Sequence, residues 1–157
     1  MTHHNCIALY FDGASRNNPR GPAGCGWSLY RMNQNADDQW IASGHKYLRY
    51  NVTSNQAEYY GLNAALNYIL NNGLSCNELH IQGDSQLVIK HLTGEFEVRS
   101  DRLRPRYNLV KQKLNDIDKR FVYYNHVRRS SNREADALAN KAIRIRRNRI
   151  YESRTFN

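Results

Sequence analysis

The amino-acid sequence predicts one α/β domain with a mixed, five-stranded β-sheet, three antiparallel strands followed by two parallel ones, flanked by helices. Three strand-like segments come first and are separated only by turns, which is typical of antiparallel neighbours. Helical and strand-like segments then alternate, as in parallel strands joined by helical crossovers. The length of 157 residues, 40% of them hydrophobic, suffices for a single domain with a core.

The three antiparallel strands are expected at residues 6–11, 24–32 and 40–48. The first is apolar, ends at Asp12-Gly13 and leads into a loop over residues 14–23 that is rich in Asn, Pro, Arg and Gly. Residues 33–39 are polar and predict a hairpin turn between the other two strands.

Helical periodicity begins near Asn55 and ends at Asn71-Asn72-Gly73. Apolar or small residues recur there with the spacing of an amphipathic helix, namely Ala57, Tyr60, Gly61, Ala64, Ala65, Tyr68 and Ile69. The later elements are expected as a strand at 78–83, a short helix at 85–92, a helix from about 107 to 117, a strand at 121–127 and a helix from 134 to about 147. An irregular basic stretch separates Gly94 from Pro105.

The charge of the chain points to a polyanionic partner. The formal net charge is +9, and basic side chains gain free energy by releasing counterions from nucleic-acid phosphates. Residues 128–149 hold eight basic residues against two acidic ones, a net charge of +6. We therefore divide the chain into a domain at 1–143 and a basic C-terminal extension at 144–157, for which a solubilising tail is the alternative interpretation.

Nothing in the sequence indicates a membrane or secreted protein. The chain lacks an apolar run of membrane-spanning length, and its first residues lack a secretory pattern. Cys6, Cys25 and Cys76 are odd in number and lack the paired spacing of a disulfide framework or a zinc site. We expect a cytoplasmic protein whose cysteines are reduced, small core residues.

Four acidic residues occupy comparable places in this layout. Asp12 and Asp84 are expected to end strands, and Glu58 and Asp136 to lie in the first turns of helices. Each also has a purely structural interpretation: a turn for Asp12, a capping box with Asn55 for Glu58, a helix cap for Asp84 and the helix dipole for Asp136.

Together the four acids indicate a metal site. Strand ends and helix starts can converge on one edge of a sheet, where clustered carboxylates repel one another and their pKa values rise. Magnesium ions, which prefer oxygen ligands, relieve that repulsion, and two of them can promote hydrolysis of a phosphodiester. No EF-hand spacing for calcium occurs.

Four local motifs resemble those of type 1 ribonuclease H, in the order of that family. They are Asp12-Gly13-Ala14-Ser15-Arg16-Asn17-Asn18-Pro19, Thr53-Ser54-Asn55-Gln56-Ala57-Glu58, Gly83-Asp84-Ser85-Gln86-Leu87-Val88 and Asn132-Arg133-Glu134-Ala135-Asp136-Ala137-Leu138-Ala139. With their connecting elements they cover residues 6–143. The resemblance implies a ribonuclease H-like fold and an endonuclease that hydrolyses the RNA strand of RNA–DNA hybrids, leaving 5′-phosphate and 3′-hydroxyl ends.

The resemblance also implies site residues. Asp12, Glu58, Asp84 and Asp136 would hold two magnesium ions, for which manganese can substitute. Asn18, Asn55 and Gln86 would face the minor groove, where 2′-hydroxyls mark RNA, and Thr53 would lie near a DNA phosphate. Turn or cap hydrogen bonds are equally compatible with these neutral residues.

The chain departs from the family pattern at three places. Ser54 stands where many members have Asn, which weakens one expected hybrid contact. Arg20 replaces the usual Gly and adds an expected phosphate contact. The stretch between Gly94 and Pro105 is short, which is similar to the compact branch without a basic protrusion. Compensating charge is then expected from the arginines at positions 99, 102, 104, 106, 144, 146, 147 and 149.

Two residues before Asp136 are candidates for helping the leaving group or product depart. His126 resembles the histidine of some members, and Arg129 the arginine of the compact branch; we favour Arg129. Three other functions stay open: a catalytically inactive hybrid-binding module, a nuclease acting on double-stranded RNA or within a larger replication machine, and a recombinase or integrase relative. We expect a monomer that binds RNA–DNA hybrid without a protein partner or a membrane.

Overall fold

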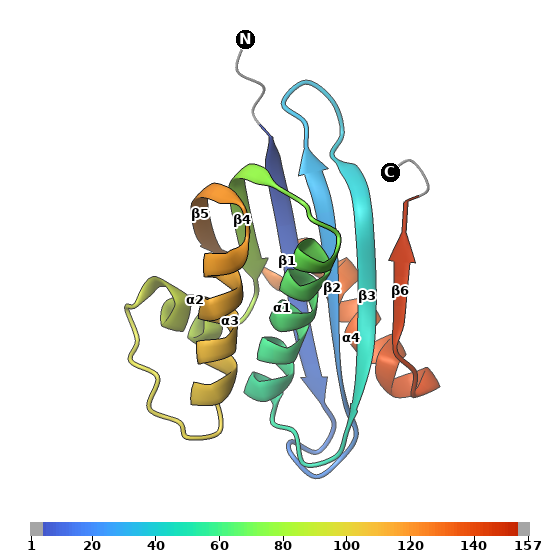
Figure 1. Cartoon of the computed structure of the whole chain (residues 1–157). Helices are drawn as coiled ribbons and strands as arrows, with labels where there is room; N and C mark the ends of the chain where they lie inside the picture. The colour runs from blue at the N-terminus through green and yellow to red at the C-terminus, as the bar shows by residue number, and fades with distance from the viewer. Residues whose placement is uncertain (1–4, 154–157) are drawn as a thin grey trace.

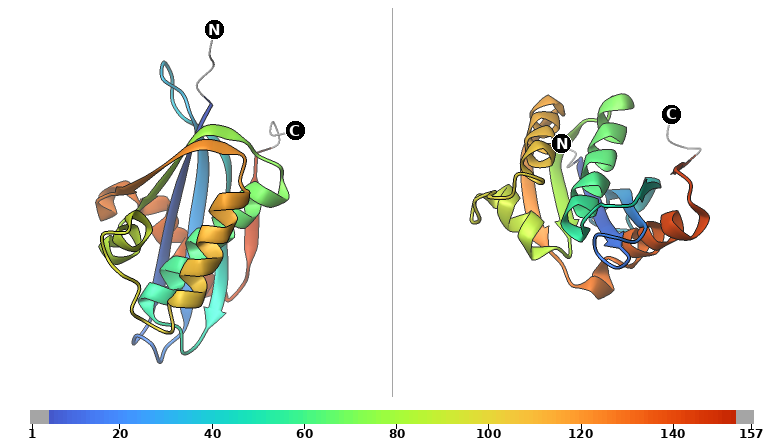
Figure 2. Two further views of the ribbon diagram at one scale, coloured as in Figure 1. Left: turned by 60° about the vertical axis from the view of Figure 1, so that its left-hand side comes forward. Right: turned by 90° about the horizontal axis from the view of Figure 1, so that it is seen from below.

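The structure is a computed structural model that describes residues 5–153. It has a single mixed sheet of six strands in the order β5-β4-β1-β2-β3-β6. Helices α1 and α3 lie side by side on one face of this sheet, and α4 lies on the opposite face (Figures 1 and 2). The predicted α/β architecture is confirmed, whereas the predicted count of five strands is wrong.

The elements follow the predicted order. The antiparallel strands are β1 (Cys6–Ser15), β2 (Ala23–Met32) and β3 (Gln39–Arg49), and the parallel strands beside β1 are β4 (Cys76–Gly83) and β5 (Lys119–His126). The helices are α1 (Ser54–Asn71), α2 (Gln86–Thr93), α3 (Arg104–Asp116) and α4 (Arg133–Ile145), the last preceded by a 3-10 turn, Arg129–Ser131. Residues 94–103 join α2 directly to α3.

The sixth strand, β6 (Arg149–Glu152), comes from the segment predicted to be a basic extension. It pairs antiparallel with the outer edge of β3, from His45–Arg149 to Ala42–Glu152. Periodicity does not reveal this strand because it has only four residues, none of them buried. Positions 154–157 of the predicted extension, like positions 1–4, lie outside the described residues.

Strand β1 is longer than predicted, so Asp12 does not end it. The parallel pairing with β4 stops at Phe11–Gly83, but β1 continues to Ser15 through its antiparallel pairing with β2. The polar composition after Asp12 predicts a loop, yet backbone hydrogen bonds to β2 keep this segment extended. Asp12 therefore lies within β1, directly after its parallel pairing with β4 ends.

Two glycines let the helices approach the sheet closely. The core lies mainly between the sheet and α1, where Ile7, Leu9 and Phe11 of β1 are fully buried. A Cβ atom at Gly13 would lie 2.3 Å from the Glu58 backbone nitrogen in α1, and one at Gly26 would lie 2.4 Å from the Ala135 carbonyl oxygen in α4. Gly13 follows Asp12 in β1, and Gly26 pairs with Asp12. The close contacts of α1 and α4 with the sheet therefore both lie next to Asp12.

Among residues 5–153, no helix combines the length and the apolar composition needed to cross a membrane.

Candidate active site

Three of the four predicted carboxylates meet at one end of the sheet. Oxygen atoms of Asp12, Glu58 and Asp84 lie within 4.8 Å of one another. Asp12 comes from β1, and Asp84 directly follows the neighbouring strand β4, so the register of the sheet brings them together. Asp12 and Glu58 are buried, whereas Asp84 is half-buried. The cluster is thus reachable from solvent on the Asp84 side.

The structure does not support the capping roles considered for Glu58 and Asp84. The capping box at the start of α1 is made by Thr53 and Gln56, whose side chains exchange hydrogen bonds with each other's backbone N–H groups. Ser85 caps α2 by accepting a hydrogen bond from the Val88 backbone. Neither Glu58 nor Asp84 therefore caps a helix. Glu58 lies in the second turn of α1, not the first as predicted.

Burial favours the protonated forms of Asp12 and Glu58. Burial raises the pKa of Asp12 to about 7, the charges of Asp84 and Asp136 raise it further, and the hydrogen bond with Glu58 opposes the shift. Burial, followed by the charge of Asp12, holds the pKa of Glu58 well above its usual range. The hydrogen bond between them raises the pKa of Glu58 and lowers that of Asp12, as when Glu58 donates the proton.

One buried atom of this cluster fits a cation. Glu58 Oε2 is buried and has no hydrogen-bond partner among the described residues. A buried carboxylate oxygen left in this way is costly, because it has lost water without gaining another donor. A divalent cation that prefers oxygen ligands would satisfy it and would also remove the repulsion among the three carboxylates. The cluster can therefore hold a divalent metal ion.

Asp136 lies near this cluster but outside the group of three. It sits in the first turn of α4, and its carboxylate accepts a hydrogen bond from Asn140 Nδ2 at 3.3 Å. Its charge is one cause of the raised pKa of Asp12, which places the two carboxylates within electrostatic reach. The close packing of α4 on Gly26 accounts for this proximity.

Asn132 is a site residue to which the sequence assigned no role. Its side chain is 2% exposed, and Nδ2 donates to the Phe11 carbonyl oxygen at 2.9 Å and to Asp84 Oδ2 at 3.3 Å. It thereby connects the start of α4 to β1 and orients the Asp84 carboxylate. Its place four residues before Asp136, in the fourth motif, was the only available signal.

Several predicted substrate residues line one recess. This recess, of about 670 Å³, is bordered by Asn18, Thr53 and Asn55 together with Arg99 and Arg102. Asn18 Oδ1 accepts a hydrogen bond from the Ser54 backbone N–H at 3.1 Å, so the loop after β1 is held against the start of α1. The lining also includes Glu97, whose carboxylate pairs with Arg99 at 3.4 Å, so Arg102 and the neutral donors are the groups that suit an anionic ligand.

The other predicted residues lie outside this recess. Gln86 is exposed at the first position of α2, and Arg20 is exposed in the loop between β1 and β2. His126 Nε2 lies 3.1 Å from the Asp84 carbonyl oxygen, next to the carboxylate cluster. Arg129 is exposed and begins the turn that leads into α4.

The predicted compensating arginines fall into two groups. Arg99 and Arg102 border the recess, and Arg106 stacks on Tyr60 with 4.2 Å between guanidinium carbon and ring centroid. The second group belongs to the C-terminal segment. Arg149 pairs with His45, His45 with Gly26, and Gly26 with Asp12, so Arg149 lies level with Asp12 three strands away. At the usual strand spacing this separation is about 14 Å.

The sequence comparisons agree on one family. A family model described as reverse transcriptase-like matches residues 10–142. Ribonuclease HI of Halobacterium salinarum is 40% identical over 137 residues, which make up 87% of this chain and 64% of that protein. The chain therefore spans less than two thirds of the length of that relative.

The structural comparisons give the same result. The crystal structure of RNase H1 from Halobacterium salinarum matches with a TM-score of 0.78 at 38% identity, covering 89% of this chain and 98% of that one. LC11-RNase H1 in complex with an RNA/DNA hybrid matches with a TM-score of 0.75 at 26% identity, over 89% and 98% of the two chains. With a family model covering most of the sequence and a structural relative matched along nearly its whole length, this chain belongs to the type 1 ribonuclease H family.

Proposed function

We propose that this protein is an endoribonuclease that hydrolyses the RNA strand of RNA–DNA hybrids with two magnesium ions, leaving 5′-phosphate and 3′-hydroxyl ends. The observation that carries the proposal is the convergence of Asp12, Glu58 and Asp84 within 4.8 Å, with a buried Glu58 oxygen that lacks a partner among residues 5–153. Family membership and the hybrid bound to LC11-RNase H1 support the choice of substrate.

The four carboxylates have different parts in this proposal. Asp12, Glu58, Asp84 and Asp136 would hold the magnesium ions, which supply activation of water and stabilisation of the departing 3′ oxygen. Asp84 is the most accessible of the three clustered acids, so we place the scissile phosphate on its side of the cluster. Asn132 keeps the Asp84 carboxylate oriented through its hydrogen bond. Asn140 does the same for Asp136.

The hybrid would be gripped on both sides of the carboxylates. We place a phosphate of the DNA strand in the recess bordered by Thr53, Asn55 and Arg102, because arginine and hydroxyl groups together suit phosphate oxygens. Asn18 and Gln86 would contact the minor groove, where the 2′-hydroxyl distinguishes RNA from DNA. Arg20 and the C-terminal arginines would add contacts to the backbone.

His126 and Arg129 remain two candidates for assisting departure of the product. His126 is held beside Asp84 by its contact with the Asp84 carbonyl oxygen, whereas Arg129 is exposed and can reach outward to phosphate. We keep the assignment to Arg129, because a side chain already bonded to the backbone is less able to follow the substrate. His126→Ala and Arg129→Ala, compared by turnover under excess substrate, separate the two; a larger loss in His126→Ala would reverse the assignment.

The test of the proposed function is cleavage of defined substrates. An RNA-labelled hybrid should be cut in the presence of Mg²⁺ or Mn²⁺, whereas double-stranded DNA and single strands should not. Cleavage of double-stranded RNA at a comparable rate would widen the substrate class. Absence of cleavage on every substrate, with hybrid binding retained, would identify an inactive binding module instead.

The matched control for this assay is the Asp84→Asn variant. It should lose cleavage while retaining hybrid binding, because the change removes one metal ligand and none of the basic surface. Loss of binding together with cleavage would mean that Asp84 supports the fold. Full activity of this variant would contradict the assignment of Asp84.

We infer that the protein acts as a monomer in the cytoplasm, without a protein partner. Its three cysteines are free thiols, which is compatible with a reducing compartment. Sedimentation of the purified protein with and without hybrid tests the oligomeric state.

A further inference from the structure

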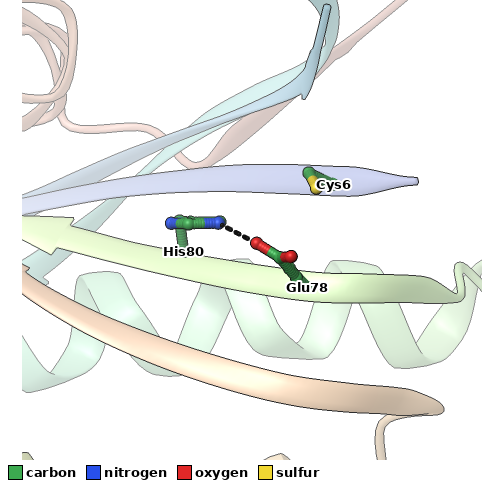
Figure 3. Close-up of side chains that lie close together, drawn as sticks. All are labelled: Cys6, Glu78 and His80. Carbon is green, nitrogen blue, oxygen red and sulfur yellow. Dashed lines mark hydrogen bonds and ion pairs between the residues drawn. The ribbon is translucent and has the colours of Figure 1, made fainter. Parts of the chain in front are cut away.

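A second group of metal-ligating side chains lies far from the carboxylates. The sulfur of Cys6, a carboxylate oxygen of Glu78 and a ring nitrogen of His80 lie within 4.8 Å of one another. Cys6 belongs to β1, whereas Glu78 and His80 belong to the adjacent parallel strand β4 (Figure 3). Cys6 and Asp12 are six positions apart in β1, which is about 20 Å along an extended strand.

The register of the sheet brings these three side chains together. Cys6 pairs with Glu78, and His80 lies two residues further along β4, so all three point to the same face of the sheet. That face is covered by α4 over β1, β2 and β3, whereas the neighbouring β5 leaves Phe121 and Tyr123 exposed there. The three side chains therefore lie at the border between the covered and the open part of this face.

Two of the ligands are already oriented. His80 Nε2 lies 2.9 Å from Glu78 Oε1, and the side chains of these residues are only 21% and 23% exposed. The His80 ring also stacks on Tyr123 of β5, with centroids 5.0 Å apart and planes 24° apart. A ring held on one side by an aromatic neighbour and on the other by a carboxylate loses little further freedom when it binds a cation.

The donor set selects the kind of metal. The acids of the catalytic cluster offer only oxygen and suit magnesium, whereas a thiolate, an imidazole and a carboxylate together suit zinc. Donors bound to one zinc ion lie roughly 3.3 to 3.8 Å apart, given bond lengths of about 2.0 to 2.3 Å. The donor atoms lie within 4.8 Å of one another, so no separation needs to shorten by more than about 1.5 Å, and the 2.9 Å between His80 Nε2 and Glu78 Oε1 needs to lengthen slightly.

We propose that Cys6, Glu78 and His80 form a zinc-binding site, distinct from the catalytic centre, that links β1 to β4. Three protein ligands leave a fourth position for water on the open side of the sheet. Bound zinc would replace the hydrogen bond between Glu78 and His80 and would link the neighbouring strands β1 and β4. Its effect would be on stability, since the site is remote from the four catalytic carboxylates.

This site could not be predicted from the sequence, because its ligands are far apart along the chain. Cys6 and His80 are 74 positions apart, so no paired motif exists. The expectation that all three cysteines are small core residues holds for the buried Cys25 and Cys76 but is wrong for Cys6, which is half-buried.

Cobalt is the probe that tests this proposal, because it reports the thiolate directly. Metal-free protein is titrated with Co²⁺ in excess Mg²⁺, which occupies the catalytic carboxylates. The proposal predicts a thiolate-to-cobalt charge-transfer band that saturates at one equivalent per chain and disappears on addition of Zn²⁺. The melting temperature should rise by a few degrees with Zn²⁺.

Two variants of the proposed site and two matched controls complete the test. Cys6→Ser should abolish the band and the zinc-dependent rise in melting temperature, and His80→Ala should weaken Co²⁺ binding at least tenfold. Cys76→Ala should retain the band, because Cys76 is a buried thiol outside the site. The His3→Ala/His4→Ala double variant should retain it too; these residues lie outside the described part of the chain and test whether N-terminal imidazoles bind the metal.

Each outcome decides for or against the site. A band that persists in Cys6→Ser, a band lost in the His3→Ala/His4→Ala variant, or no band at all in folded wild-type protein overturns the proposal. The readout is spectroscopic and needs no cleavage, so failure of the zinc site and failure of the proposed nuclease function are separate results. Hybrid cleavage by His80→Ala should equal that of the wild type.

Discussion

At the scale of single residues, Glu58 is placed to bind a cation, and this placement lowers the stability of the metal-free fold. Its carboxyl is buried beside Asp12, one of its oxygens lacks a hydrogen-bond partner among the described residues, and its pKa is held well above the usual range by burial and by the charge of Asp12. Without a metal ion, the buried Asp12–Glu58 pair is favourable in the folded protein only while the pair holds a proton.

This pair predicts an unusual pH dependence of stability. Asp12 and Glu58 bind protons more tightly in the folded than in the unfolded state, since the pKa of Asp12 rises from 3.8 to about 7 on folding. Their contribution is therefore fully present below about pH 4 and is lost as the pH rises through the raised pKa values. In EDTA the melting temperature should therefore fall as the pH rises through these raised pKa values. Saturating Mg²⁺ should abolish this fall.

The variant Glu58→Gln isolates the effect. A neutral amide still donates to Asp12 but cannot ionise, so at pH 8 in EDTA the variant should melt several degrees above the wild type, while hybrid cleavage is lost. Glu95→Gln, in an exposed loop, should match the wild type in both measurements. A variant that melts at or below the wild-type temperature under these conditions would refute the account of Glu58.

Asn132 provides a second prediction at this scale. Replacing it with Ala removes the hydrogen bonds to Asp84 and to the Phe11 carbonyl oxygen, which leaves a buried acceptor unsatisfied. Replacing a residue that orients a metal ligand typically lowers metal affinity or activity by about 10- to 100-fold. We expect the Mg²⁺ concentration for half-maximal cleavage to rise by about that factor, with activity recovering at high Mg²⁺.

The control for Asn132 is an asparagine without such contacts. Asn115→Ala, on the exposed side of α3, should leave the Mg²⁺ dependence unchanged. If Asn132→Ala lowers the rate equally at all Mg²⁺ concentrations, the residue does not act through Asp84. The four acids could be recognised from their motifs, but the role of Asn132 could not, because it depends on a contact between residues 48 positions apart.

At the scale of elements, the C-terminal strand β6 connects the basic tail to the site. Its pairing with β3 places Arg149 level with Asp12 across the sheet. The loop before it is anchored by His45 Nδ1 to the Arg147 carbonyl oxygen at 2.9 Å and by Asn148 Oδ1, which accepts from the Tyr47 backbone N–H at 2.8 Å. The arginines are thus held on the sheet and not on a free tail.

The salt dependence of hybrid binding tests this placement. Each phosphate contact contributes about 0.7 to 0.9 to the slope of log affinity against log salt. Arg147→Gln/Arg149→Gln should therefore flatten the slope by roughly 1 to 2. Arg31→Gln/Arg120→Gln removes the same charge at the opposite end of the sheet and should leave the slope unchanged. Equal slopes in the two variants would mean that the tail makes no specific contact.

Sequence patterns predicted most elements well but not this one. Strands and helices with a buried face carry a periodic signal, as in α1, whereas β6 has only four residues and no buried one. The extension of β1 past Asp12 was missed for a related reason. Its polar residues resemble a loop, and only pairing with β2, a tertiary interaction, keeps them extended.

At the scale of the whole molecule, opposite charges are separated in a way that suits a polyanionic substrate. The net charge is +9, yet acidic side chains from β1, α1 and the end of β4 converge, with α4 adding a fourth nearby. The composition predicted the polyanionic partner, and the motifs predicted which acids would converge. Neither could predict that one of the four, Asp136, would lie outside the closest group, since this depends on how α4 packs on β2.

The central claim is that Asp12, Glu58, Asp84 and Asp136 share divalent cations at the scissile phosphate. Anomalous diffraction from crystals of the wild-type protein with Mn²⁺ and an RNA–DNA hybrid made non-cleavable at the scissile linkage tests it most directly, because the anomalous signal identifies Mn²⁺ and all four carboxylates are present. The account predicts manganese peaks between these side chains and one phosphate of the RNA strand. Manganese bound elsewhere, or a hybrid seated away from the carboxylates, would contradict it.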